Sequence, residues 1–143
     1  MNQEQNYNMI DWWKKVYLKN YANFSGRARR AEFWYFTLAS FLIYIIFAFL
    51  TAITGIANDG SPLLAIIFAI FYLSLVIPTL AVTVRRLHDI NKSGWYYFIS
   101  LIPLVGSIIL LVWLFTDGDR FVNNYGDDPK NPGIPKFDFE NVS

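Results

Sequence analysis

The chain contains no cysteine and a single histidine. Without cysteine it has no disulfide bond, no thiol nucleophile and no cysteine-based metal site. Because His88 is the only histidine, a site that holds zinc through several imidazoles is excluded as well. We therefore expect no cofactor and no metal centre.

Charge is missing from three long stretches, residues 33–58, 60–84 and 93–116, which together hold 75 of the 143 residues. A helix needs about 20 mostly apolar residues to cross a hydrocarbon core about 30 Å thick, and each stretch is long enough. The sequence therefore predicts an all-α membrane protein with three transmembrane helices. Pro103 and Gly106, in the middle of the third stretch, leave open a third helix that is broken between them.

The basic residues predict the orientation of these helices. Six Lys/Arg precede the first stretch, none lies between the first and second, and three lie between the second and third. By the positive-inside rule, the N-terminus and the second connection face the cytoplasm. The tail after Thr116 is acidic, with three Lys/Arg against six Asp/Glu. Three complete spans place this tail outside, whereas a broken third segment returns it to the cytoplasm.

This pattern divides the chain into three parts. Residues 1–32 form an N-terminal cytoplasmic segment, residues 33–116 a transmembrane helical domain, and residues 117–143 an acidic polar tail. Within the first part, residues 11–24 have the pattern of an amphipathic helix, with aromatic side chains opposite Lys14, Lys15 and Lys19. Such a helix suits the headgroup region of a membrane. The alternative is that it packs on the protein's own loops.

Two charged clusters flank the first and second spans on the cytoplasmic side. The first comprises Arg27, Arg29 and Arg30, followed by Glu32. Arginines in this position fix orientation and attract anionic lipid without specificity, at about 1 kcal/mol for each basic residue. The alternative is a binding site for an anionic headgroup or a partner protein.

The second cluster is the sequence RRLHD at the end of the second span. On a helix, Asp89 lies one turn from Arg85 and close to Arg86, so that an ion pair can form within the cluster. Glu32, at the same depth before the first span, is a further partner. A salt-bridged helix end is the leading interpretation, followed by ligand or headgroup binding. Catalysis by His88 and Asp89 on a headgroup-bearing substrate is the third.

A transport function is a separate hypothesis. Proton- or ion-coupled transporters normally keep an ionisable residue within the membrane, and the three stretches contain no Asp, Glu, Lys, Arg or His. The remaining possibility is a homo-oligomer that conducts a small solute past Ser74, Pro78 and Thr79. The basic residues lie beside the spans and not on a separate basic domain, so we expect no nucleic-acid partner.

Several short motifs occur in a fixed order: GRARR with EFW, RRLHD with SGW, IPLVG, and NNYGDDP. This ordered set resembles the bacterial inner-membrane family known as domain of unknown function 805, over about residues 12–130. The resemblance implies a small multi-pass inner-membrane protein with no settled activity, and it supplies no catalytic residue. The matching positions are Arg27, Arg29, Arg30, Glu32, Arg85, Arg86, His88, Asp89, Gly94, Trp95, Asn123, Tyr125, Gly126, Asp128 and Pro129. Asp127 replaces the family's usual proline.

The leading functional hypothesis is therefore non-enzymatic. The protein would bind anionic lipid headgroups, a membrane-protein partner or a second copy of itself through a basic cytoplasmic face. The N-terminal arginines would contact phosphate or carboxylate groups, while Glu32 and Asp89 hold Arg85 and Arg86 in place. The candidate residues are Arg27, Arg29, Arg30, Glu32, Arg85, Arg86, His88 and Asp89, with a candidate tail motif of Asn123, Tyr125, Gly126, Asp128 and Pro129.

Overall fold

The computed structural model describes residues 3–54 and 62–133, and its regular elements within these ranges are helical. The only β-type pairing in these ranges is an isolated bridge between Asn123 and Gly126. The prediction of an all-α protein is confirmed. The elements are the 3-10 helix η1 (Gln3–Asn6), α1 (Met9–Lys14), the π-helical η2 (Lys15–Lys19), α2 (Arg30–Thr54), α3 (Pro62–Asp89), the 3-10 helix η3 (Gly94–Leu101) and α4 (Val105–Phe115).

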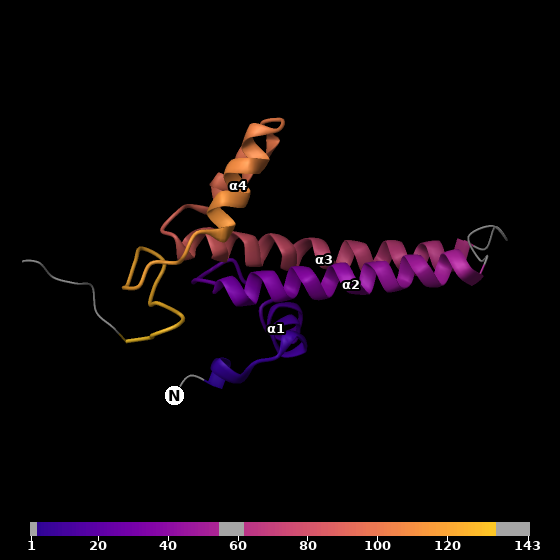
Figure 1. The fold of residues 1–143 in the computed structure, drawn as a ribbon, viewed down its shortest axis with the longest axis horizontal. Coiled ribbons are helices and arrows are strands. Elements are labelled where there is room, and N and C mark those ends of the chain that lie inside the picture. Colours follow the sequence, from indigo (N-terminus) through magenta and orange to yellow (C-terminus); the bar gives the residue numbers. More distant parts are fainter. Residues whose placement is uncertain (1–2, 55–61, 134–143) are drawn as a thin grey trace, which may run out of the picture.

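Helices α2 and α3 lie side by side and form the long axis of the molecule (Figure 1). They contain 25 and 28 residues, which correspond to roughly 37 and 42 Å at 1.5 Å per residue. Only 11% of the most apolar part of α2 and 22% of that of α3 is buried within the protein. A core helix of a soluble protein would be mostly buried. Their length and exposed apolar surface therefore fit two membrane-spanning helices.

The third apolar stretch is not one continuous helix but is broken near Pro103, which is the alternative that the sequence left open. The third apolar stretch folds into η3 and α4, which pack together as a hairpin that projects sideways from α2 and α3 (Figure 1). Helix α4 has 11 residues and is roughly 16 Å long, too short to cross a membrane. Pro103 ends the first arm, and Leu104 turns the chain with φ 63° and ψ −62°. The Val105 N–H donates to the Pro103 carbonyl at 2.7 Å, which closes a γ-turn.

The position of the η3–α4 hairpin determines where the tail after Thr116 begins. Its second arm ends beside the last turn of α3, where the Arg86 guanidinium donates to the carbonyls of Leu114 (3.2 Å) and Thr116. Arg30, at the start of α2, donates to the Phe115 carbonyl at 3.1 Å. The tail therefore starts at the same end of the helix pair as the N-terminal segment. This placement agrees with a broken third segment, and a cytoplasmic position of the tail stays a prediction.

The N-terminal amphipathic helix is shorter than predicted. It runs through α1 and η2 and ends at Lys19, where the Asn20 side-chain amide donates to the Lys15 carbonyl at 3.1 Å. Its aromatic face packs against α2 and α3: Trp12 is 3% exposed, and the Trp13 indole N–H donates to Ser40 Oγ at 3.1 Å. Its aromatic side chains therefore contact the protein's own helices. A position at the membrane interface stays a prediction.

A proline in α3 explains how the N-terminal helix is fastened. Pro78 has no N–H, so the Ser74 carbonyl four residues earlier lacks its helical donor. The Tyr21 hydroxyl donates to that carbonyl oxygen at 2.7 Å, and the Tyr17 hydroxyl lies 2.8 Å from Ser74 Oγ. The N-terminal segment thus supplies the donor that the proline removes. This contact lies 15 residues from the Asp89 end of α3, which corresponds to roughly 22 Å.

Candidate functional site

The two charged clusters predicted from the sequence meet in two neighbouring groups of ion pairs, which together we call the charge cluster (Lys15, Arg27, Glu32, Arg85, Arg86 and Asp89). Glu32 is fully buried and forms two ion pairs, with Arg85 Nη1 at 2.5 Å and with Lys15 Nζ at 2.6 Å. The prediction that Glu32 pairs with the RRLHD sequence is confirmed. Lys15 was not predicted as a partner. It also pairs with Glu4 at 2.7 Å, while its ion pair with Glu32 joins the N-terminal segment to α2.

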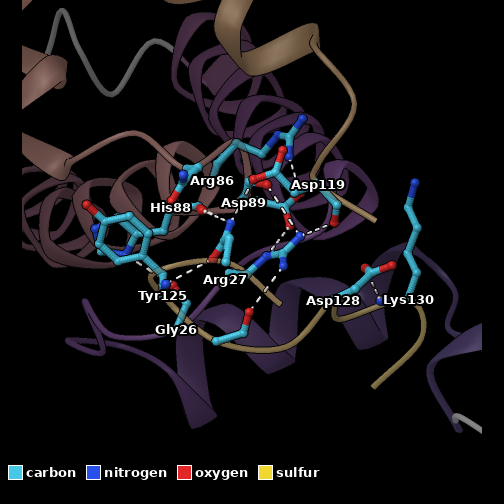
Figure 2. Close-up of polar contacts among 12 residues, drawn as sticks. Gly26, Arg27, Arg86, His88, Asp89, Asp119, Tyr125, Asp128 and Lys130 are labelled. Atoms are coloured by element: carbon cyan, nitrogen blue, oxygen red, sulfur yellow. Dashed lines mark hydrogen bonds and ion pairs between the residues drawn. The ribbon is translucent and has the colours of Figure 1, made fainter. Parts of the chain in front are cut away.

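Asp89 forms the second half of the charge cluster, and the predicted ion pair with Arg86 is present. The other carboxylate oxygen of Asp89 accepts from Arg27 Nε at 2.9 Å. Figure 2 shows Arg27 between Asp89 and the tail, where its guanidinium also donates to the carbonyls of Phe121 (2.8 Å) and Gly126 (3.2 Å). Arg27 therefore joins the start of α2, the end of α3 and the tail.

The tail packs directly against the end of α3. The backbone of Gly118 lies so close to the Asp89 carboxylate that a Cβ there would be 2.0 Å from Oδ2. The Asn123 side-chain amide donates to the His88 carbonyl at 2.9 Å. The Tyr125 ring stacks on the His88 ring, with centroids 3.8 Å apart and planes within 5° (Figure 2). Two residues of the candidate tail motif, Asn123 and Tyr125, therefore contact His88.

The rest of the tail motif shapes its own turns. The Tyr125 N–H donates to Asn123 Oδ1 at 2.9 Å, and Gly126 takes φ 120°, a conformation that favours glycine. Asp128 is buried, and its carboxylate accepts from the Lys130 backbone N–H at 2.8 Å across the turn that contains Pro129. The replacement of a proline at position 127 is therefore compatible with an ordered tail that reaches the charge cluster.

Burial limits what the charge cluster can bind. The side chains of Arg27, Arg85 and Arg86 are 1%, 4% and 0% exposed, and all three form ion pairs within the protein. Arg29 and Arg30, which belong to the same predicted clusters, have side chains that are 13% and 43% exposed. Of the five arginines in the two predicted clusters, only these two present a guanidinium toward the surface. Arg85 keeps Nε and Nη2 buried with no hydrogen-bond partner among the described residues.

Arg29 and Arg30 border an open pocket of about 440 Å³, here called the headgroup pocket. Its basic residues come from two distant segments, because Lys130 of the tail lies opposite the start of α2. The Arg29 guanidinium lies over the Trp12 ring, 5.7 Å from its centroid. This pocket could not be predicted from the sequence, because its members lie as far apart in the chain as Glu4 and Lys130. The main lining residues are Glu4, Tyr7, Trp12, Arg29, Arg30, Tyr35 and Lys130.

A second pocket, of about 470 Å³, lies between the end of α3 and η3, and is here called the histidine pocket. Gly94 brings η3 close to α3, since a Cβ at this position would lie 2.7 Å from Val84 Cγ1. His88 is the one member of this pocket that belongs to the predicted candidate residues. The main lining residues are Phe24, Leu80, Val84, His88, Ser93 and Trp95.

The geometry bears on the alternative functions. Both carboxylate oxygens of Asp89 accept from arginines, and no contact joins Asp89 to the His88 ring, so these two residues do not form an acid–base pair. Among the described residues, no group of three or more His, Asp or Glu side chains is placed to hold a metal ion. Along the proposed solute path, the tyrosines of the N-terminal segment occupy both polar groups of Ser74.

Comparison with known families identifies the family of this chain. Residues 21–127 match the family described as "Protein of unknown function (DUF805)". The chain belongs to this family. The resemblance inferred from the ordered motifs is confirmed, and the match covers the charge cluster from Arg27 to Asp89 together with the tail contacts up to Gly126. No solved structure matches the chain.

Relatives within this family are found in Escherichia coli. "Inner membrane protein YhaI" of strain K12 is 38% identical over 121 residues, which cover 85% of this chain and 97% of that protein. "Inner membrane protein YhaH" of the same strain is 37% identical over 121 residues, 85% of this chain and 98% of that protein. "Uncharacterized protein YiiR" is 38% identical over 106 residues, 70% of this chain and 66% of that protein. This DUF805 protein is accordingly a small integral protein of the inner membrane.

Proposed function

We propose that this protein binds anionic lipid headgroups at the cytoplasmic face of the inner membrane, through the headgroup pocket. The observation that carries the proposal is the pocket itself, which gathers Arg29, Arg30 and Lys130 at one end of two lipid-exposed helices. Guanidinium groups recognise phosphate with two parallel hydrogen bonds, whereas lysine acts as a point charge. The tyrosine and tryptophan rings of the pocket are typical of a membrane interface.

In this proposal, the charge cluster positions the residues of the headgroup pocket. The buried pairs of Glu32 and Asp89 fix the start of α2 against the end of α3, and this places Arg29 and Arg30 side by side at the surface. The sequence predicts that Glu32 and Asp89 hold Arg85 and Arg86 in place, and the ion pairs agree with those roles. Arg27 is enclosed by internal contacts, so the proposal leaves it out of the headgroup contacts.

A phosphate can compete for Arg30. The Arg30 guanidinium pairs with Asp117 at 2.7 Å, and both side chains are well exposed, at 43% and 65%. An exposed ion pair of this kind contributes about 0–1 kcal/mol to stability. An anionic headgroup can therefore replace Asp117 at little cost in free energy. The partner of Arg29 is Glu4, whose Oε2 lies 3.3 Å away and whose other carboxylate oxygen pairs with Lys15 at 2.7 Å.

The predicted orientation of the protein supports the same site. The pocket lies at the end of α2 and α3 that carries the basic residues, which the positive-inside rule assigns to the cytoplasm. The cytoplasmic leaflet is rich in anionic lipid, and each basic residue near its surface contributes about 1 kcal/mol of attraction. Binding of a membrane-protein partner or of a second copy through this face stays a prediction.

The test compares two double variants of the full-length protein. Arg29→Gln/Arg30→Gln removes two charges from the pocket, and Lys14→Gln/Lys19→Gln removes two exposed charges from the N-terminal helix, outside the pocket. Each protein is reconstituted with a mixture of dioleoylphosphatidylcholine and dioleoylphosphatidylglycerol, and the lipids it retains in mild detergent are counted by native mass spectrometry. Two charges at about 1 kcal/mol each correspond to roughly 30-fold, and competition from Asp117 reduces this to about tenfold.

We therefore expect the arginine variant to lose about tenfold of its preference for phosphatidylglycerol, and the lysine variant to change by no more than about twofold. An equal loss in the two variants would mean that the whole basic face attracts lipid without a site. Unchanged retention in a folded arginine variant would remove the proposal altogether.

A further inference from the structure

We propose that the histidine pocket is a second, separate site, which binds a neutral lipid carrying a free hydroxyl group. In this site the ligand hydroxyl donates its hydrogen to Nε2 of His88, and the apolar part of the ligand lies along α3 and η3. The proposal does not depend on lipid binding at the headgroup pocket, because the two pockets share no lining residue.

The His88 ring is held in one orientation by two contacts. Its Nδ1 lies 3.1 Å from the Gly26 carbonyl oxygen, which can only accept, so Nδ1 carries the hydrogen. The Tyr125 ring covers one face at 3.8 Å between centroids and 5° between planes. His88 is only 9% exposed, yet it lines the pocket. In the neutral ring, Nε2 is then an acceptor for which the described residues provide no partner.

The pocket around this acceptor is apolar. Its volume of about 470 Å³ is in the range of small-molecule sites, and Leu80, Val84, Phe24 and Trp95 form most of its wall. Trp95 is 79% exposed on the outer surface of the η3–α4 hairpin, whose uncharged sequence suits contact with lipid. A ligand dissolved in the membrane can therefore reach the pocket without crossing water.

The polar atoms of the pocket select a hydroxyl group. The neighbouring carboxylate, Asp89, is occupied by two arginines, so the pocket supplies no anion that would stabilise a charged imidazole. A buried charge without a partner is unfavourable, and the neutral ring fits this environment. Ser93 Oγ accepts from the Trp95 backbone N–H at 3.4 Å, which leaves the hydrogen of Ser93 for a second bond. A ligand hydroxyl can donate to His88 and accept from Ser93, whereas an ester or ether oxygen can only accept.

The chain's single histidine makes a direct test possible. The full-length protein is labelled with ¹⁵N-histidine, reconstituted in phosphatidylcholine bilayers and titrated with one of two probes, 1,2-dioleoylglycerol or its 3-acetyl ester, which lacks the hydroxyl. We expect dioleoylglycerol to shift the Nε2 resonance and to leave the Nδ1 resonance nearly unchanged. We expect the acetyl ester to leave both resonances in place.

A pocket-filling variant gives a second readout. Leu80→Phe adds volume to the wall of the pocket without touching His88 or its two contacts, so the spectrum without probe should match the wild type. Its half-saturation by dioleoylglycerol should require at least tenfold more probe. Equal shifts with both probes, or no shift with either, would overturn the proposal. A shift caused by dioleoylphosphatidic acid and not by dioleoylglycerol would overturn it in favour of an anionic ligand.

Discussion

The contact between Tyr21 and the carbonyl freed by Pro78 gives a quantitative test of how the N-terminal segment is attached. The Tyr21 hydroxyl is the donor to the Ser74 carbonyl, at 2.7 Å. Tyr21→Phe removes only that hydroxyl and leaves a half-buried carbonyl without a partner. Pro78→Ala restores a backbone N–H at the position from which an α-helix donates to the same oxygen. The two substitutions should therefore be coupled.

The expected magnitudes follow from this geometry. An unsatisfied buried carbonyl costs about 1–3 kcal/mol, and hydrogen bonds between membrane helices average about 0.6 kcal/mol with a maximum near 1.7. Because Tyr21 and Ser74 are half-buried, we expect Tyr21→Phe to lower the free energy of unfolding by about 1–1.5 kcal/mol. In the Pro78→Ala background the same change should cost less than about 0.5 kcal/mol. The coupling energy is then about 1 kcal/mol.

The assay is reversible unfolding in mixed micelles with increasing mole fraction of dodecyl sulfate, followed by circular dichroism. Tyr17→Phe is the matched control, because its partner Ser74 Oγ also donates to the Phe71 carbonyl at 2.6 Å and does not depend on the proline. Tyr17→Phe should therefore lower the free energy of unfolding by the same amount in the wild-type and the Pro78→Ala backgrounds. A coupling energy for Tyr21 and Pro78 that is zero within error, or equal to that of Tyr17, would refute the reasoning.

Three further substitutions and one control, Glu4→Gln, test the packing around the charge cluster and the hairpin, each by the same unfolding assay. Glu32→Gln leaves the buried Arg85 without its carboxylate and Lys15 with Glu4 alone, and it should cost about 3–5 kcal/mol. Glu4→Gln, at a side chain 24% exposed, should cost no more than about 1 kcal/mol. Similar costs for the two would contradict this account. Gly118→Ala places a methyl group 2.0 Å from an oxygen of Asp89 and should cost about 1–3 kcal/mol; a neutral result would mean that the tail is not packed there. Gly106→Ala brings a Cβ within 1.8 Å of a backbone oxygen of η3 and should destabilise by a similar amount, whereas an unchanged midpoint would contradict the hairpin.

Hydropathy was sufficient to locate the two spanning helices but not the hairpin. The first two apolar stretches became α2 and α3, and α3 continues through Pro78 to Asp89 as the helical spacing of the RRLHD sequence suggested. The third stretch is equally free of charge, and hydropathy contains no information about whether an apolar segment is continuous. Pro103 marked the break, but the γ-turn at Leu104 and the tight approach at Gly106 depend on contacts between the two arms.

The candidate site was predicted in part. The pairing of Glu32 with Arg85 followed from their equal depth at the ends of two neighbouring spans. Lys15 was assigned to the polar face of an amphipathic helix, because the sequence does not show that this helix packs against α2. The contribution of Lys130 to the headgroup pocket depends on the return of the tail, which was undecided while the third segment could be either complete or broken.

The central claim is that the hairpin returns the tail to the side of the membrane that carries the N-terminal segment. Because the chain has no cysteine, single-cysteine variants can be labelled without background. Lys19→Cys and Asn124→Cys replace exposed residues of the N-terminal segment and the tail. With a membrane-impermeant maleimide, both positions should react in inverted inner-membrane vesicles and remain unlabelled in intact spheroplasts. Labelling of Asn124→Cys in spheroplasts, with Lys19→Cys still protected, would contradict the account.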